Sequence, residues 1–199
     1  MKEMKIRIAT IEDASSILDI YEPYILNTPI TFEYDKVAIK EFEGRIENIQ
    51  SKYPYLVCTI EDTIVGYAYC STHRERAGFK WDCECSVYLK EEYSRKGIAS
   101  SLYEALFTIM YTLGYYNIYA LICVPNDKSV ALHHKFGFYE IGTYANTAYK
   151  LGEWRDLLVM VKVLREFVVP KAAPLSIHDL DEEYINKVLE DVTRKLNHK

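Results

Sequence analysis

Residues 84–102 read ECSVYLKEEYSRKGIASSL and combine a strand, a polar turn, a glycine loop and the start of an amphipathic helix. Backbone N–H groups that such a loop aims along a helix N-terminus form an anion site, above all for phosphates. Arg95 and Lys96 add positive charge next to Gly97, and Glu84 provides a carboxylate one strand upstream. A phosphate site beside a candidate base indicates an enzyme that uses a phosphorylated cofactor.

The strand predicted at residues 82–89 has two unlike faces, because successive side chains of a strand point to opposite sides. The residues of the apolar face are Cys83, Cys85, Val87 and Leu89. Those of the polar face are Asp82, Glu84, Ser86 and Tyr88. Glu84 is therefore expected to point toward a cleft or solvent, while Cys85 faces the core.

Hydrophobic periodicity on both sides of this strand predicts a mixed α/β domain rather than a repeated strand–helix–strand unit. Thr10 and Asp13 form a capping box for a first helix, which Pro23 is expected to bend or end. A helix that starts at Gly97 has its apolar residues at helix spacing and ends at Gly114. The other expected elements are strands 4–9, 55–60, 63–70, 82–89, 117–124 and 156–165, a helix 37–51, and a short helix capped by Asn126 or Asp127.

Composition and charge are those of a globular protein without a signal peptide. The chain has 199 residues, 49% of them hydrophobic and 27% charged, and no apolar run approaches the roughly 18 residues that span a bilayer. No membrane partner is expected, and a cytoplasmic location follows. A net charge of −5 argues against nucleic acid as a partner. The five cysteines mostly lie in apolar runs, which favours buried reduced thiols, so no metal is expected.

Near the C-terminus the composition changes, which divides the chain into an expected domain at 1–166 and a linker with a helical extension at 167–199. A capping box that begins at Ser176 opens a charged helix over 178–197. Its apolar positions step by four: Leu180, Tyr184, Val188, Val192 and Leu196. This helix is expected to pack on the surface of the domain; a contact between two copies and a partly disordered tail are the alternatives.

Five motifs in order resemble the GCN5-related N-acetyltransferase (GNAT) superfamily, and within it the phosphinothricin and methionine sulfoximine acetyltransferase group. They are IRIATIEDASSILDIY, NTPITFEY, ECSVYLKEEYSRKGIASSLYEAL, NDKSVALHHKFGF and KLGEWRDLLVM. The resemblance covers about residues 5–165. It implies a splayed mixed sheet flanked by helices, with the gap between strands 82–89 and 117–124. It also implies an enzyme that moves an acetyl group from acetyl-CoA to the primary amine of a small, amino-acid-like acceptor.

The same resemblance implies which residues bind acetyl-CoA: the pyrophosphate loop, a strand whose backbone pairs with the pantetheine arm, and a site where that arm bends. The pyrophosphate loop consists of Arg95, Lys96, Gly97, Ile98, Ala99 and Ser100. The strand positions beside the pantetheine arm are Val87, Tyr88 and Leu89, and the residues at the bend are Asn126 and Ser129. Val87 would polarise the thioester carbonyl. Ser94 stands where the family usually has Arg or Gln, which weakens one side-chain contact but leaves the backbone N–H groups in place.

The reaction needs an amine that has lost its proton, and such an amine has a pKa well above 7, so a base must accept that proton. Glu84 matches the family's general base, and a partly desolvated cleft would raise the pKa of its carboxyl; a solvated strand carboxylate is the alternative. His133 lies four residues after Ser129 on one helix face and matches a histidine beside the thioester. It either exchanges a proton or only contacts the cofactor or the core. Cys85 stands where the family often has His, and nothing in the sequence makes it a nucleophile.

The acceptor pocket has weaker signals. Arg74 and Arg76 lie in the loop where the family holds the acidic groups of its acceptor, and guanidinium groups suit carboxylates; otherwise they are two solvated side chains. Phe32, Glu33 and Trp154 resemble positions of the family's acceptor pocket or dimer interface. The loop that holds the two arginines departs from the family's proline-bearing version, so the sequence does not identify the acceptor.

Two further hypotheses of function stay open at this point. Ser94 and Cys85 are departures that would suit a CoA-binding regulatory module without turnover, although the retained site residues argue against it. Acetylation of a polyamine or of a protein N-terminus is the other, and Arg74 and Arg76 would repel a polyamine. A homodimer is also among the expectations.

Overall fold

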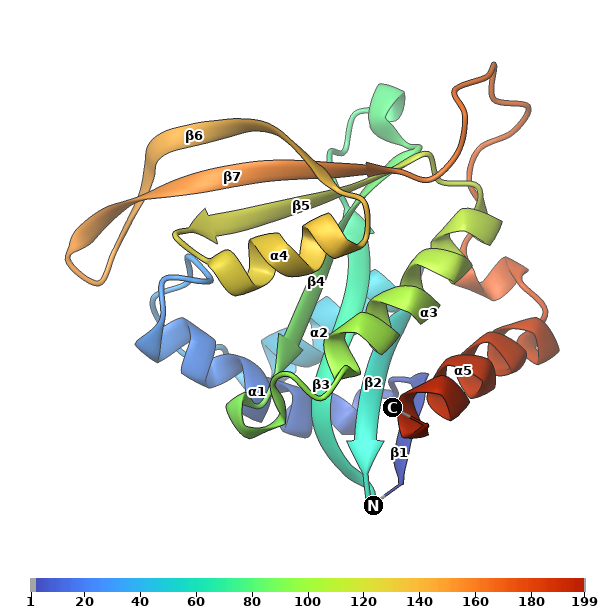
Figure 1. Ribbon diagram of the computed structural model, residues 1–199, viewed down its shortest axis with the longest axis horizontal. Helices are drawn as coiled ribbons and strands as arrows, with labels where there is room; N and C mark the ends of the chain where they lie inside the picture. Colours follow the sequence, from blue (N-terminus) through green and yellow to red (C-terminus); the bar gives the residue numbers. More distant parts are fainter. Residues whose placement is uncertain (1–2, 199) are drawn as a thin grey trace.

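The computed structural model describes residues 3–198, which form a seven-stranded sheet with helices on both sides (Figure 1). The strands are β1 (Met4–Ile8), β2 (Tyr55–Ile60), β3 (Thr63–Thr72), β4 (Asp82–Leu89), β5 (Asn117–Val124), β6 (Tyr139–Lys150) and β7 (Glu153–Val163). The α-helices are α1 (Ala14–Asn27), α2 (Ile39–Gln50), α3 (Ile98–Leu113), α4 (Asp127–Lys135) and α5 (Glu182–Asn197). The mixed sheet flanked by helices that the sequence predicts is confirmed.

The sheet contains one parallel pair, and that pair is short. Its strand order is β1-β2-β3-β4-β5-β7-β6, and every neighbouring pair except β4 and β5 is antiparallel. The parallel pairing runs only from Asp82 opposite Asn117 to Glu84 opposite Tyr119. Beyond Glu84 the two strands diverge, as Figure 1 shows. The predicted gap between these strands is therefore present.

Each face of the sheet has its own hydrophobic cluster. Tyr55 and Val57 belong to the cluster under α1 and α2, whereas Leu56 and Cys58, their neighbours in β2, belong to the cluster under α3 and α5. This division follows from the two-residue period of a strand and gives β2 the continuous apolar character of a strand covered on both sides. Within residues 3–198, no helix combines the length and the apolar character that crossing a bilayer requires.

Helix α3 begins and ends at glycines, as the sequence predicts. Gly97 has φ +81° at its start and Gly114 has φ +97° at its end, in the left-handed region where a side chain is strained. The predicted apolar stripe of α3 is fully buried: Ile98, Leu102, Leu106, Ile109 and Leu113. This burial fixes the direction of the helix, so its N-terminus points toward the end of β4.

Pro23 does not end the first helix, because α1 continues to Asn27. Proline lacks the N–H that would bond the carbonyl of Asp19 one turn earlier. Both residues lie on the exposed side of α1, where water can bond that carbonyl instead. The capping box of Thr10 and Asp13 is present but opens a single 3-10 turn, after which α1 begins.

Helix α5 packs on α3 and on the edge strand β1, so the expected packing on the domain's own surface is observed. Its buried residues are Ile185, Leu189, Val192 and Leu196. Of the predicted stripe, Val192 and Leu196 are buried, whereas Leu180, Tyr184 and Val188 are half-buried and pack against the same cluster. Ile185 and Leu189 are buried as well, because a helix of 3.6 residues per turn places positions three and four apart on one face. Asn197 bonds the backbone N–H and C=O of Met4 at 2.9 and 2.8 Å, and Thr193 Oγ accepts the N–H of Ile6 at 3.0 Å. These bonds cover part of an edge that would otherwise be unpaired.

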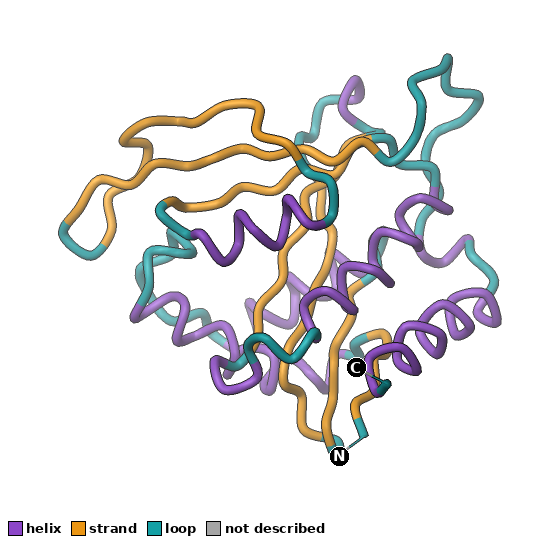
Figure 2. The backbone as a smooth tube through the Cα atoms, viewed as in Figure 1, coloured by secondary structure: helices purple, strands orange, loops and turns teal. Residues whose placement is uncertain are grey.

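Strands β6 and β7 form a long hairpin that reaches beyond the body of the molecule (Figure 2). β7 begins at Glu153, earlier than the strand predicted from residue 156. The hydroxyl of Tyr34 donates to the carbonyl of Tyr149, and buried Lys150 donates to the carbonyl of Thr31 at 2.6 Å. Both bonds fasten the hairpin to the loop that follows α1.

Replacing Asn197 with alanine removes both side-chain bonds to the β1 edge. We expect N197A to lower the free energy of unfolding by about 1–2 kcal/mol, since each such hydrogen bond contributes about 1 kcal/mol. Urea denaturation measures the change. N186A, an exposed asparagine on the same helix, is the matched control and should change the stability by less than about 0.5 kcal/mol. Equal stabilities of the two variants would contradict the role given to Asn197.

Candidate active site

The gap between β4 and β5 contains a pocket that is open to solvent. Both walls are strand residues, and the remaining sides come from α3, from α4 and from Ile30 in the loop after α1. The lining residues include 85–88 of β4, 120–123 of β5, and Tyr103, Asn126, Ser129 and His133. Of the predicted site residues, Val87, Tyr88, Asn126, Ser129 and His133 therefore meet in one pocket.

The backbone of β4 offers hydrogen-bonding groups to this pocket at alternate residues. The N–H of Lys90 donates to the carbonyl of Val65 at 2.9 Å, so the backbone groups of Lys90 face β3. The carbonyl of Leu89 instead accepts the hydroxyl of Tyr24 at 2.6 Å. Because the direction alternates along a strand, Val87 faces the gap as Leu89 does, and Tyr88 faces β3. Of the three predicted strand positions, Val87 is therefore the one whose backbone N–H and C=O are directed into the pocket. The backbone of Leu89 already bonds the hydroxyl of Tyr24. The backbone of Tyr88 faces β3, so only the side chain of Tyr88 can line the pocket.

The predicted phosphate loop leads into the N-terminus of α3. Arg95 has φ +62° and Gly97 has φ +81°, which turns the chain sharply before the helix. The first intrahelical bond runs from Ser101 N–H to the carbonyl of Gly97, so the N–H groups of Ile98, Ala99 and Ser100 have no partner within the helix. These three N–H groups, with their helix dipole, form an anion site.

Three cationic side chains surround this loop, and the sequence identified two of them. Arg95 is exposed, and the Lys96 ammonium lies 4.6 Å from the centre of the Tyr93 ring. The third is Lys135 at the end of α4, whose ammonium donates to Ser100 Oγ at 3.1 Å. Residue spacing alone could not reveal Lys135, because 35 positions separate it from Ser100.

Asn126 and His133 hold the start of α4 against the pocket. The side chain of Asn126 caps α4 by accepting the N–H of Ser129 at 3.2 Å. His133 is only 3% exposed, and its Nδ1 lies 2.8 Å from the carbonyl of Ser129, so Nδ1 carries the hydrogen. Nε2 then accepts the hydroxyl of Tyr103 at 3.1 Å. Burial lowers the pKa of His133 below its usual value, so the ring is neutral and suited to contact rather than to carrying charge.

Cys85 and Glu84 face opposite ways, as predicted. Cys85 is buried, and its sulfur lies 4.0 Å from His133 Nε2. Desolvation raises the pKa of the Cys85 thiol far above its usual value, so the residue is a thiol and not a nucleophilic thiolate. Across the described part of the chain, no three His, Cys, Asp or Glu side chains converge as metal ligands.

Glu84 lies on the opposite face of β4, where pairing with β5 ends. One carboxylate oxygen, Oε1, accepts the Nδ1–H of His73 at 2.7 Å. Desolvation raises the pKa of the Glu84 carboxyl, while the bond from His73 and the charge of Arg74 act in the opposite direction. His73 was not among the predicted site residues, because it meets Glu84 only through the pairing of β3 with β4, in which Ser71 lies opposite Glu84.

The predicted acceptor residues separate into two groups. Arg74 and Arg76 are exposed in the loop between β3 and β4, and the Arg74 guanidinium lies 5.2 Å from the centre of the Phe79 ring. Phe32 is half-buried in the loop after α1. Glu33, beside it, takes part in a polar network and lines a second pocket, under α1 and α2, rather than the pocket between β4 and β5.

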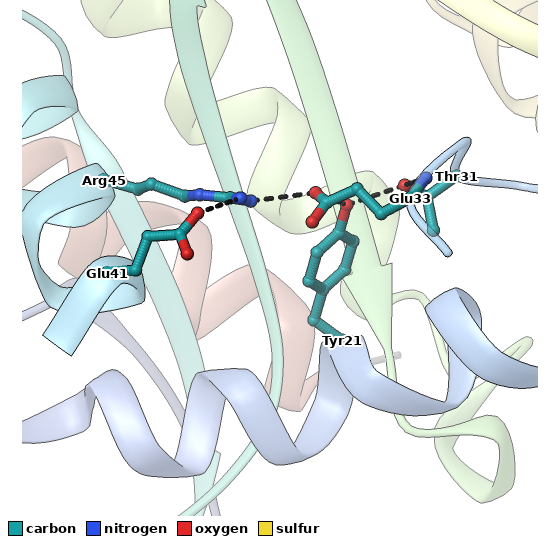
Figure 3. Close-up of polar contacts among 5 residues, drawn as sticks. All are labelled: Tyr21, Thr31, Glu33, Glu41 and Arg45. Atoms are coloured by element: carbon teal, nitrogen blue, oxygen red, sulfur yellow. Dashed lines mark hydrogen bonds and ion pairs between the residues drawn. The ribbon is translucent and has the colours of Figure 1, made fainter. Parts of the chain in front are cut away.

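Figure 3 shows this network. Glu33 Oε1 accepts the hydroxyl of Tyr21 and a guanidinium N–H of Arg45, both at 2.8 Å. Arg45 also bonds Glu41 at 2.6 Å, and the Tyr21 hydroxyl lies 2.7 Å from Thr31 Oγ1. Glu33 is therefore engaged by Tyr21 and by Arg45, whose single positive charge it shares with Glu41, and this favours a role in holding the loop after α1 in place.

Comparison with known proteins agrees with this geometry. The family model of the acetyltransferase (GNAT) domain matches residues 6–159. Phosphinothricin N-acetyltransferase of Streptomyces viridochromogenes is 33% identical over 78% of this chain and 85% of its own. L-methionine sulfoximine/L-methionine sulfone acetyltransferase of Salmonella typhimurium is 29% identical over 85% of this chain and 99% of its own. The crystal structure of a phosphinothricin acetyltransferase from Sinorhizobium meliloti with acetyl-CoA has a TM-score of 0.82 at 32% identity, covering 88% of this chain and 96% of its own.

Proposed function

The chain belongs to the acetyltransferase (GNAT) family and is an acetyl-CoA-dependent N-acetyltransferase, and from that premise we propose that its acceptor is a small, amino-acid-like primary amine. The position of Glu84 is the main observation that supports an active site at this gap. It lies where the pairing of β4 with β5 ends, at the edge of the gap that contains the pocket.

The residues around the gap fit acetyl-CoA, which supplies an acetyl group activated as a thioester. The N–H groups of Ile98, Ala99 and Ser100 suit its pyrophosphate, because they have no partner within α3. Val87 directs an N–H and a C=O into the gap, where they suit the amides of the pantetheine arm and a carbonyl oxygen. Asn126, at the start of α4, completes the pocket wall.

Glu84 acts as the general base in this proposal. A C–N bond forms between the amine and the acetyl carbon, the C–S bond breaks, the amine proton passes to Glu84, and CoA leaves as a thiolate that takes up a proton. Because desolvation raises the pKa of the Glu84 carboxyl, this group binds a proton more firmly than a solvated carboxylate does. The neutral ring of His133 stays a pocket wall that fixes Tyr103 and the start of α4.

The loop between β3 and β4 supports the acceptor class. Arg74 lies close enough to Glu84 to act on its charge, so an acceptor whose amine reaches Glu84 can place an acidic group near this guanidinium. Phosphinothricin and methionine sulfoximine, the substrates in the names of the relatives, combine an amine with acidic or polar groups in this way. The loop therefore suits an amino acid better than a polycation.

We also propose a homodimer that resides in the cytoplasm. The β6–β7 hairpin exposes large side chains, with Tyr144 at 52% and Trp154 at 62% exposure, which is typical of an interaction surface. All five cysteines are free thiols, as a reducing compartment requires.

Sedimentation should give the mass of two chains, and W154S should weaken the association; a monomer at micromolar concentration would contradict the dimer.

Replacing Glu84 with glutamine removes the base and keeps the size of the side chain. We expect E84Q to lower kcat by roughly 10²–10⁴-fold while the Kd for CoA stays unchanged. In the wild-type enzyme kcat/KM should rise with pH as Glu84 loses its proton, and E84Q should lack this rise. Steady-state kinetics and calorimetry measure the two effects. E190Q, an exposed carboxylate on α5, is the control; an unchanged pH profile in E84Q would exclude Glu84 as the base.

Lys135 should contribute to binding the phosphates of CoA, because its ammonium lies beside the N-terminus of α3. We expect K135A to weaken CoA binding about 5-fold, which corresponds to about 1 kcal/mol. The difference should shrink at high salt, since an exposed charge is screened. K128A, an exposed lysine of the same helix, is the control. Equal affinities of K135A and K128A would contradict this role.

A further inference from the structure

His73 forms a defined pair with the proposed base. It follows β3 directly, and its Nδ1 lies 2.7 Å from Glu84 Oε1. Its ring also stacks on the ring of Tyr119, with 4.0 Å between the ring centres and 6° between the planes. The His73 side chain is 11% exposed and that of Glu84 28%, so the pair is largely shielded from solvent.

Three strands bring these residues together. In the antiparallel pair Ser71 lies opposite Glu84, and in the parallel pair Glu84 lies opposite Tyr119. His73, two residues beyond Ser71, lies on the same side of the sheet as Glu84 because side chains alternate along a strand. The ring of Tyr119 supplies a flat surface that fixes the plane of the imidazole. The position of His73 therefore depends on both neighbours of β4.

The hydrogen bond defines which atoms remain free. A carboxylate has no hydrogen to donate, so Nδ1 of His73 carries the hydrogen of this bond. Oε1 of Glu84 is occupied by this bond, which leaves Oε2 as the oxygen that can take a proton. A charge-assisted bond of 2.7 Å restricts the rotation of the carboxyl group.

Few other ionisable groups act on Glu84. Arg74 in the loop favours its charged form, and the hydroxyl group of Tyr69 on β3 lies within range of its charge. On β5 the neighbouring ionisable group is the phenol of Tyr119. Asp82, Tyr139 and Arg74 lie within electrostatic range of that phenol and affect its pKa. His73 makes the one direct side-chain bond to Glu84 among the described residues.

We propose that His73 is a positioning residue that holds Glu84 through Oε1, keeps the carboxylate ionised and directs Oε2 toward the acceptor amine. The inference rests on the proposed function, in which Glu84 is the base. Without the bond from His73, desolvation of Glu84 would act with less opposition, and its pKa would rise further. Since the base works only when deprotonated, the rise of kcat/KM with pH would then move to higher pH.

Two substitutions separate the bond from the ring. H73F keeps a flat ring against Tyr119 but has no donor, and H73Q keeps a donor but loses the ring. We expect H73F to move the acidic limb of the kcat/KM profile up by about one pH unit and to lower kcat/KM below that limb about 10-fold. H73Q should keep the limb near its wild-type position. H178F, which replaces an exposed histidine far along the chain, should have the wild-type profile.

The outcomes distinguish this inference from the proposed function. If E84Q abolishes the limb and H73F leaves it in place, His73 does not position the base although Glu84 is the base. If E84Q keeps the limb, the proposed function itself fails. Imidazole 15N NMR gives a readout that is independent of activity. A protonated Nδ1 on His73 that changes in E84Q supports the pair, and an Nδ1 without hydrogen overturns it.

Discussion

The early end of the parallel pairing between β4 and β5 is the constraint on which the site depends. After Glu84 the inner edge of β4 has no neighbouring strand, yet it lies beside a pocket within the fold. Backbone N–H and C=O groups without partners cost free energy, so such an edge requires water or a ligand with amide groups. At its outer end the hydroxyl of Tyr24 meets the backbone of Leu89, and Val87 faces the gap itself. In the proposed function, acetyl-CoA takes the place of the missing strand.

Strand β4 also separates two chemical environments, because its side chains alternate between two faces. On the side of Cys85, burial holds a thiol and the neutral ring of His133, neither of which is charged. On the side of Glu84, a carboxylate, His73 and Arg74 lie at the edge of the sheet. The charged groups that handle a proton in the proposed function are therefore kept apart from the apolar wall of the pocket.

Local sequence signals predicted much of this arrangement. Alternation in β4 placed Glu84 and Cys85 on opposite faces, and glycine and asparagine signals placed the starts of α3 and α4. The site residues that the sequence did not reveal are placed by contacts between segments that lie far apart in the chain. His73 reaches Glu84 through the register of β3 with β4, and Lys135 reaches α3 through the packing of α4. The roles of the two loop arginines also stay a prediction, since exposed side chains carry no packing signal.

In the proposed function, the open edge of β4, at Val87, receives acetyl-CoA. Amide NMR of the 15N-labelled enzyme during titration with acetyl-CoA tests it directly, because each backbone N–H gives its own signal. We expect the Val87 signal to shift on binding and its exchange with solvent to slow, while Tyr88, whose N–H faces β3, changes much less. Saturation with acetyl-CoA that leaves the shift and the exchange of Val87 unchanged would show that acetyl-CoA does not bind at this edge.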